Sequence, residues 1–171
     1  FNNITGNQQD FYPKYAQKDI DEINEVVYHS INNGVYKAGF ATSQQAYEKA
    51  FTNIFSVLDK LDNVLSQQRY LTGSDISEAD WRLFTTLIRF DAVYVGHFKC
   101  NHKRIADYPS ISAYLRELYQ VDGVAETVSL DHIKTHYYKS HLTINPTGVI
   151  PLGPEQDFMA SHDRDVLFPA N

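Results

Sequence analysis

A helix start signal at Ser77-Glu78-Ala79-Asp80 constrains this fold more than any other stretch. Ser77 is followed three positions later by Asp80, and an apolar run comes directly afterwards. A hydroxyl and a carboxylate at this spacing form a capping box, which satisfies backbone N–H groups that the first turn of a helix leaves open. Ile76, just before the cap, can pack on the first turn as a hydrophobic staple. We therefore expect a helix over about 77–94, and its apolar residues lie on several faces, which predicts a central, buried position.

Four further segments carry apolar residues at helical spacing. The firmest begins at Thr42 or Ser43 and ends at about Gln67, with apolar residues stepping by three and four without a break. The others cover about 17–32, 109–119 and 129–140. No segment alternates as a strand would, so we predict an all-α fold.

Three stretches lack helical periodicity. Residues 1–16 predict an extended lead-in, and residues 142–171 an irregular tail in which Pro and Gly recur. Residues 35–40 follow Asn32-Asn33-Gly34, which is typical of a helix stop, and are expected to form a short connector. The total of 171 residues is suited to one domain.

Composition excludes several kinds of partner. The net charge is −6, whereas nucleic-acid binding needs clustered Lys and Arg to neutralise phosphates. No apolar run approaches the length of a membrane span. The single cysteine, Cys100, cannot form an internal disulfide, which is typical of a reducing compartment. We predict a cytoplasmic protein that binds neither nucleic acid nor membrane.

Seven histidines raise the question of a metal site. His132 and His136 share a helical face, and His97, Cys100 and His102 are close in sequence. Neither group has the glutamate of a zincin or the paired cysteines of a structural zinc site. We therefore predict no metal.

Four blocks besides the capping box carry a family resemblance. They are NNGVYKAGFATSQQAY at 32–47, RFDAVYVGHFKC at 89–100, RIADYPSISAYLRELYQVDGVAETV at 104–128 and DHIKTHYYKSHLTINPTGVIPLGP at 131–154. Together they resemble the Xi-class glutathione transferases, the glutathionyl-hydroquinone reductases, over about residues 17–154. The resemblance implies a helical bundle like the C-terminal domain of these enzymes, without the N-terminal thioredoxin-like domain.

The resemblance also implies how the chain is organised. Residues 1–16 would be an interdomain linker, residues 17–141 the helical substrate-binding domain, and residues 142–171 an irregular C-terminal tail. The catalytic cysteine of the family lies in a Cys-Pro motif of the thioredoxin-like domain, and Cys100 does not match it. This chain alone is therefore expected to be inactive, and the whole protein is expected to form a homodimer.

The family's reaction removes glutathione from a glutathionyl-hydroquinone through a cysteine mixed disulfide, with glutathione as co-substrate. Tyr36 in GVYKAGF and Tyr137 in HIKTHYYKSH match the substrate tyrosines of the family. A phenolic hydroxyl suits this role because it can donate a hydrogen bond or a proton to a ring oxygen.

Further candidates lie near these tyrosines in the sequence: Tyr94, Arg89, His97, Lys99 and Lys139. Two structural alternatives stay open. Arg89 and Asp91 can form a buried ion cluster at a helix end, and Lys139 with His141 can be a solvated helix terminus, which favours cations.

A rival interpretation is a non-catalytic protein-interaction module with a transferase-like helical fold. Such a module would need neither the substrate tyrosines nor the 131–154 block. A transferase of another class is disfavoured by the long TINPTGVIPLGP stretch.

Overall fold

The computed structural model describes residues 4, 6 and 8–169, so part of the predicted lead-in lies outside the described residues. Within this part of the chain no strand forms, and the one β feature is an isolated bridge between Tyr70 and Gly73. The predicted all-α fold is confirmed. The α-helices are α2 (Gln17–Val27), α3 (Gly34–Gly39), α4 (Gln44–Leu65), α5 (Glu78–Arg89), α6 (Pro109–Tyr119), α7 (Leu130–Ser140) and α8 (Arg164–Leu167). Two π turns, η1 (Tyr28–Asn32) and η2 (Phe90–Tyr94), and two 3₁₀ turns, η3 (Ile105–Asp107) and η4 (Ala125–Thr127), complete the set.

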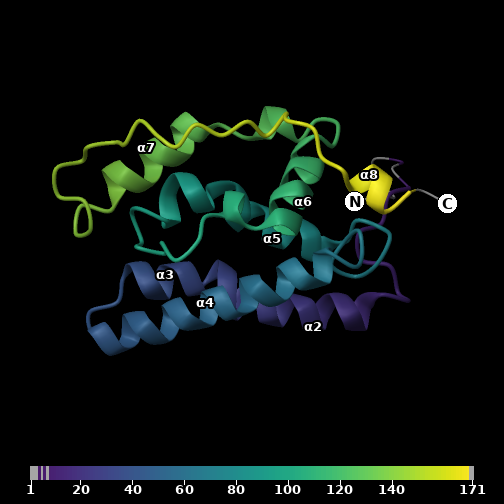
Figure 1. The fold of residues 1–171 in the computed structure, drawn as a ribbon, viewed down its shortest axis with the longest axis horizontal. Helices are drawn as coiled ribbons and strands as arrows, with labels where there is room; N and C mark the ends of the chain where they lie inside the picture. The colour runs from purple at the N-terminus through teal and green to yellow at the C-terminus, as the bar shows by residue number, and fades with distance from the viewer. Residues whose placement is uncertain (1–3, 5, 7, 170–171) are drawn as a thin grey trace.

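Helix α5 lies at the centre of the bundle. Helices α2, α3 and α4 form a layer on one side of it, α7 lies on the other side, and the chain after α7 runs back toward α6 and α8 (Figure 1). Most of α5 is buried, including Leu83, Leu87 and Ile88, as its apolar pattern predicts. The face of α4 that carries Ile54, Leu58, Leu61 and Leu65 is buried too, in agreement with its periodicity.

The predicted connector over residues 35–40 is wrong, because helix α3 occupies these positions. The sequence predicts a helix stop at Gly34, yet this glycine does not adopt the positive φ of a helix-ending glycine. A Cβ atom at Gly34 would lie 3.1 Å from Cγ1 of Ile54, tighter than ordinary contact. The glycine therefore serves close packing of α3 on α4 and does not end a helix.

The capping box at the start of α5 forms as predicted. The Ser77 amide and hydroxyl both donate to Oδ2 of Asp80 at 2.8 Å. The other oxygen of Asp80 accepts from the Leu71 amide at 2.9 Å and from the Tyr114 hydroxyl at 2.8 Å. Asp80 is fully buried, and these four bonds satisfy a carboxylate that would otherwise be costly to bury.

The buried Arg89–Asp91 ion cluster, one of the two structural alternatives, does not form. Asp91 is buried, but its carboxylate accepts from the backbone amides of Ile105 at 2.6 Å and Ala106 at 3.1 Å, at the start of η3. Arg89 instead donates to the backbone carbonyl of Thr85. The π turn η2 begins between the two residues and sends their side chains to different neighbours.

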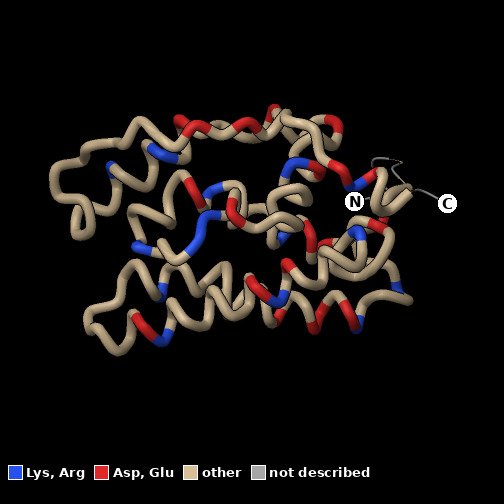
Figure 2. Tube along the Cα trace, viewed as in Figure 1, with Lys and Arg blue, Asp and Glu red and all other residues tan. Residues whose placement is uncertain are grey.

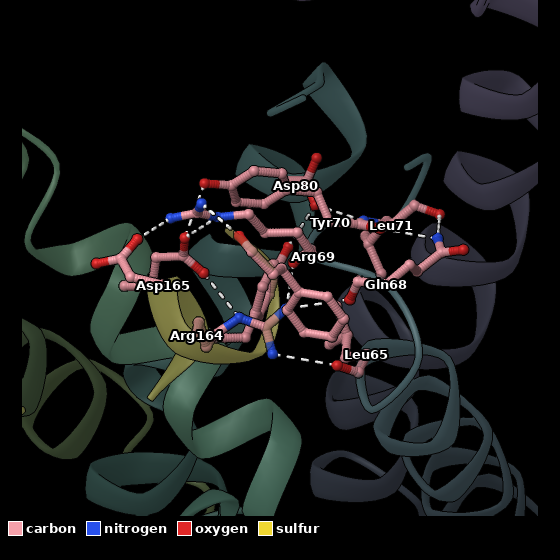
Figure 3. Close-up of polar contacts among 11 residues, drawn as sticks. Leu65, Gln68, Arg69, Tyr70, Leu71, Asp80, Arg164 and Asp165 are labelled. Carbon is pink, nitrogen blue, oxygen red and sulfur yellow. Dashed lines mark hydrogen bonds and ion pairs between the residues drawn. The ribbon is translucent and has the colours of Figure 1, made fainter. Parts of the chain in front are cut away.

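The C-terminal tail is anchored by a buried ionic network (Figure 3). Arg164 is 1% exposed, and its Nε donates to Oε2 of Glu117 on α6 at 2.7 Å. The other Glu117 oxygen accepts from Nε of Arg69 at 2.7 Å and from the Tyr70 hydroxyl at 2.9 Å. Arg164 also donates to the Leu65 carbonyl at 3.1 Å, and Arg69 pairs with Asp165. Apart from α8 the described tail is irregular, and this network fixes it against α6 and the segment around Arg69.

Charged residues are spread along the rest of the chain. Acidic residues recur along α2, while Lys and Arg are dispersed (Figure 2). No described helix combines the length and the apolar character that a bilayer crossing requires.

The ionic network makes a stability prediction. Arg164→Met should lower the free energy of unfolding by about 3 kcal/mol, because it leaves a buried carboxylate of Glu117 with fewer partners. Urea unfolding followed by circular dichroism measures the change.

Arg104→Met is the matched control, since the Arg104–Asp107 pair is a surface ion pair at 2.7 Å. Such pairs contribute little, so the control should unfold like the unmodified chain. Equal effects of the two substitutions would contradict the anchoring role of Arg164.

Candidate functional site

A cleft of about 660 Å³ opens on one side of the bundle. Its lining comes from η1, α3, α5, η2 and α7, and includes Tyr28, Asn32, Tyr36, Trp81, Arg89, Tyr94 and Tyr137. Residues about a hundred positions apart in the sequence meet there, so the cleft exists only in the folded chain.

Three tyrosine hydroxyls meet at the cleft. The hydroxyl oxygens of Tyr36 and Tyr137 are 2.6 Å apart, and those of Tyr94 and Tyr137 are 2.8 Å apart. Tyr94 and Tyr137 are 2% and 5% exposed, whereas Tyr36 is 38% exposed. The two tyrosines singled out by the family resemblance thus share one cavity, with Tyr94 behind them.

A buried aromatic ring supports all three tyrosines. Phe98 is fully buried, stacks on Tyr94 with ring centroids 5.4 Å apart, and contacts Tyr36 at 5.2 Å and Tyr137 at 5.9 Å. A Cβ atom at Gly39 would lie 2.3 Å from the Phe98 ring, so only glycine fits there. Close approach of α3 at Gly39 therefore helps to fix the tyrosine cluster.

Tyr94 reaches the cluster because α5 ends in the π turn η2. A π turn holds one residue more than an α turn. It therefore rotates every later side chain by about 100° around the helix axis relative to a regular helix. A uniform α-helix over 77–94, which the sequence predicts, would direct Tyr94 elsewhere.

Burial keeps the inner hydroxyls protonated. It raises the pKa of Tyr94 far above its ordinary value, and the hydrogen bond with Tyr137 raises it further. Burial also raises the pKa of Tyr137 to about 12, with the contact to Tyr36 adding to the effect. Both are therefore neutral phenols near pH 7.

Arg89 brings positive charge to the cleft wall, and its side chain is half-buried.

The sequence did not single out Asn32, Trp81 and Thr86, which also line the cleft. Asn32 Nδ2 donates to the Thr86 hydroxyl at 2.6 Å, and the indole Nε1 of Trp81 is buried without a partner. In the sequence, Asn32 belongs to a helix-stop pattern and Trp81 to an apolar helical run. Neither pattern indicates that the residue lines a cleft.

The structure does not bring the remaining candidates to the cleft. His97 is buried and lies 3.2 Å from His141 through Nε2 and Nδ1, and burial lowers the pKa of both imidazoles. Lys99 is exposed at a positive φ of 61°, and Lys139 is exposed on α7.

Cys100 is fully buried, and burial raises the pKa of its thiol to about 12. A thiol in this state is a poor nucleophile, because the thiolate is the reactive form. Across the residues that the structure describes, no three His, Cys, Asp or Glu side chains gather as a metal site would need.

Comparison with known proteins adds to this geometry. Residues 44–117 match the glutathione S-transferase C-terminal domain. Over 159 residues the chain is 56% identical to the glutathionyl-hydroquinone reductase YqjG of Escherichia coli strain K12, covering 93% of this chain and 48% of that protein. It is 50% identical to the glutathionyl-hydroquinone reductase PcpF of Sphingobium chlorophenolicum, covering 91% and 50%. The chain thus spans about half the length of the curated relatives it matches.

Solved structures agree. The glutathione-bound structure of E. coli YqjG matches with a TM-score of 0.93 and 55% identity, over 95% of this chain and 53% of that one. The Xi-class transferase of Natrialba magadii matches with a TM-score of 0.95 and 46% identity, over 97% and 51%. The fold and these matches identify the chain as a C-terminal helical domain of the glutathione transferase type. More particularly, it is a domain of the Xi class, as the sequence blocks predicted.

The raised pKa of Tyr137 gives a prediction about alkaline stability. The folded chain keeps a proton that the unfolded chain releases at an ordinary pKa of about 10. The contribution of Tyr137 to stability is therefore complete below about pH 10 and is lost as the pH rises through about 12. Urea unfolding between pH 7 and this range should show the decline, and Tyr137→Phe should reduce it.

Tyr15→Phe is the control, because Tyr15 is 82% exposed. It should leave the pH dependence of stability unchanged. An alkaline decline of the same size in the Tyr137→Phe variant would show that the tyrosine cluster does not hold the proton.

Proposed function

We propose that this chain is the substrate-binding part of a glutathione-dependent reductase that releases glutathione from glutathionyl-hydroquinones. The nucleophilic cysteine and most glutathione contacts would lie on a thioredoxin-like domain preceding these residues. Residues 17–141 would bind the aromatic part of the substrate, and residues 142–171 would form a tail fixed to it. The whole protein would be a homodimer.

The proposed reaction has two steps. A cysteine thiolate attacks the glutathione sulfur, the bond between that sulfur and the aromatic carbon breaks, and the carbon takes up a proton. The products are a hydroquinone and a protein–glutathione disulfide. A second glutathione then attacks this disulfide, which releases glutathione disulfide and restores the thiol. The substrate is reduced and glutathione is oxidised.

The contact of 2.6 Å between the Tyr36 and Tyr137 hydroxyls, inside one cleft, is the observation that supports this proposal most strongly. Negative charge shifts onto the ring oxygens of the substrate as the carbon–sulfur bond breaks. Neutral phenols placed in a partly buried cleft can donate hydrogen bonds to these oxygens where the charge develops. An interaction module would have no use for such an arrangement.

The tyrosines provide the direct test. In the full-length protein, with a thioredoxin-like domain preceding this chain, Tyr36→Phe and Tyr137→Phe should each lower kcat/KM for a glutathionyl-hydroquinone by about a hundredfold, because each substitution removes or weakens hydrogen-bond donation at a developing charge. Steady-state kinetics measure this effect.

Tyr119→Phe on α6 is the control, since Tyr119 does not line the cleft. Unchanged turnover in both cleft variants would remove these hydroxyls from the mechanism. A full-length protein without any turnover would instead favour the interaction module.

Cys100 offers a separate prediction. Cys100→Ala should leave kcat unchanged, because the buried thiol cannot reach a substrate in the cleft. In the unmodified chain, Cys100 should react with a thiol reagent such as dithionitrobenzoate only after urea unfolding. Loss of turnover in a folded Cys100→Ala variant would contradict this assignment.

A further inference from the structure

The three tyrosine hydroxyls of the cleft form a chain whose protons can be counted. A hydroxyl has one proton to donate and two lone pairs that accept. Among the residues that the structure describes, the Tyr94 hydroxyl contacts only Tyr137, the Tyr36 hydroxyl contacts only Tyr137, and the Tyr137 hydroxyl contacts both. Three protons therefore share two contacts, and one proton is left over.

Burial decides the first link of this chain. Tyr94 is 2% exposed, so a hydroxyl proton that finds no acceptor in the protein would stay unsatisfied. Leaving a buried donor unpaired costs more than the average hydrogen bond contributes. The Tyr137 oxygen, 2.8 Å away, is the acceptor within reach. Tyr94 therefore donates to Tyr137.

The second link follows from the first. Tyr137 is 5% exposed, and the Tyr36 oxygen lies 2.6 Å away as an acceptor for its single proton. Tyr36 is 38% exposed and lines the cleft, so its proton is the one left over. We propose that Tyr94 is a positioning residue that sets the direction of this chain, so that Tyr94 donates to Tyr137, Tyr137 to Tyr36, and Tyr36 to a phenolic or phenolate oxygen bound in the cleft.

The surroundings hold the chain in this direction. The Tyr94 ring is stacked on Phe98 at 5.4 Å and packs edge-on against Phe90 at 6.0 Å, so it cannot swing away. The raised pKa values of Tyr94 and Tyr137 keep both protons in place near neutral pH. Hydrogen bonds aligned in one direction polarise one another, which makes Tyr36 a stronger donor than an isolated phenol.

This inference deepens the proposed function and rests on it for the identity of the ligand. The ligand is an aromatic molecule with a ring oxygen that accepts a hydrogen bond from Tyr36. It assigns different roles to the two substrate tyrosines. In the competing arrangement, Tyr137 accepts from both neighbours and itself donates to the ligand. The two arrangements differ in which tyrosine touches the bound oxygen.

The test uses this chain and 4-nitrophenolate as the probe, at a pH where the probe is ionised. A hydrogen bond donated to the phenolate oxygen stabilises the charge on that oxygen and moves the visible absorption band to shorter wavelength. Titration gives the affinity, and the band position reports the strength of the donor. The probe bound to the unmodified chain should absorb at a shorter wavelength than the probe bound to Tyr36→Phe, which lacks the donor.

Tyr94→Phe is the decisive variant. It should weaken probe binding about three- to tenfold and move the absorption band of the bound probe to longer wavelength, because Tyr36 loses the polarising effect of Tyr94. Tyr137→Phe should cause at least as large a change in the band, which provides a second measurement if Tyr94→Phe folds poorly. Tyr138→Phe is the matched control, since it removes a buried hydroxyl that contacts the Ala92 carbonyl at 3.4 Å and not the cluster.

Three outcomes would overturn the proposal. One is a Tyr94→Phe or Tyr137→Phe variant with the band position of the unmodified chain. Another is a band that moves to longer wavelength in Tyr137→Phe but not in Tyr36→Phe, which supports the competing arrangement. The third is a lack of binding by the unmodified chain. These results are independent of turnover, so a full-length protein that is inactive on glutathionyl-hydroquinones would sink the proposed reaction and leave the direction of the chain standing.

Discussion

The buried carboxylate of Asp80 is the interaction on which the rest of the bundle depends. Its four hydrogen bonds join the start of α5 to the segment after α4, through Leu71, and to α6, through Tyr114. Because α5 is central, fixing its first turn sets the axis along which the whole helix runs. The other end of the same helix passes into η2 and carries Tyr94 to the cleft. The hydrogen bonds of Asp80 at the start of α5 thus help to set the position of Tyr94 at the other end of the helix.

The buried polar cluster around Glu117 and the tyrosine cluster at the cleft differ in kind. Around Glu117, two guanidinium groups and a hydroxyl neutralise and satisfy a carboxylate completely, and the result is a rigid anchor. At the cleft, three neutral hydroxyls are held by the ring of Phe98, and one of them is partly exposed. A satisfied ionic cluster has nothing left to offer a ligand, whereas a neutral cluster that reaches a cavity does. The Glu117 cluster can therefore only anchor the fold, whereas the tyrosine cluster keeps a hydroxyl that can contact a ligand in the cleft.

Much of the fold could be predicted because its signals are local. The box at Ser77–Asp80 and the apolar face of α4 act within one helix, and both are found as expected. Helix α3 was not predicted because Gly34 allows close packing on Ile54 of α4, and a contact between two helices cannot be seen in the local sequence. The role proposed for Tyr36 and Tyr137 rests on family resemblance, and the sequence pattern did not show that their hydroxyls lie together. The direction of the Tyr94 side chain depends on the π turn η2. Helical periodicity could not predict this direction, because it assumes that every turn is a regular α turn.

The anchoring of Arg164 has a consequence for the order of synthesis. A ribosome makes Glu117 well before Arg164, so the nascent chain carries an incompletely compensated acidic group in its core until Arg164 emerges. Arg69 and Tyr70 are already present by then and can hold one oxygen of that group. The domain would therefore collapse first around α5 and become fully stable only when α8 docks and Arg164 reaches Glu117.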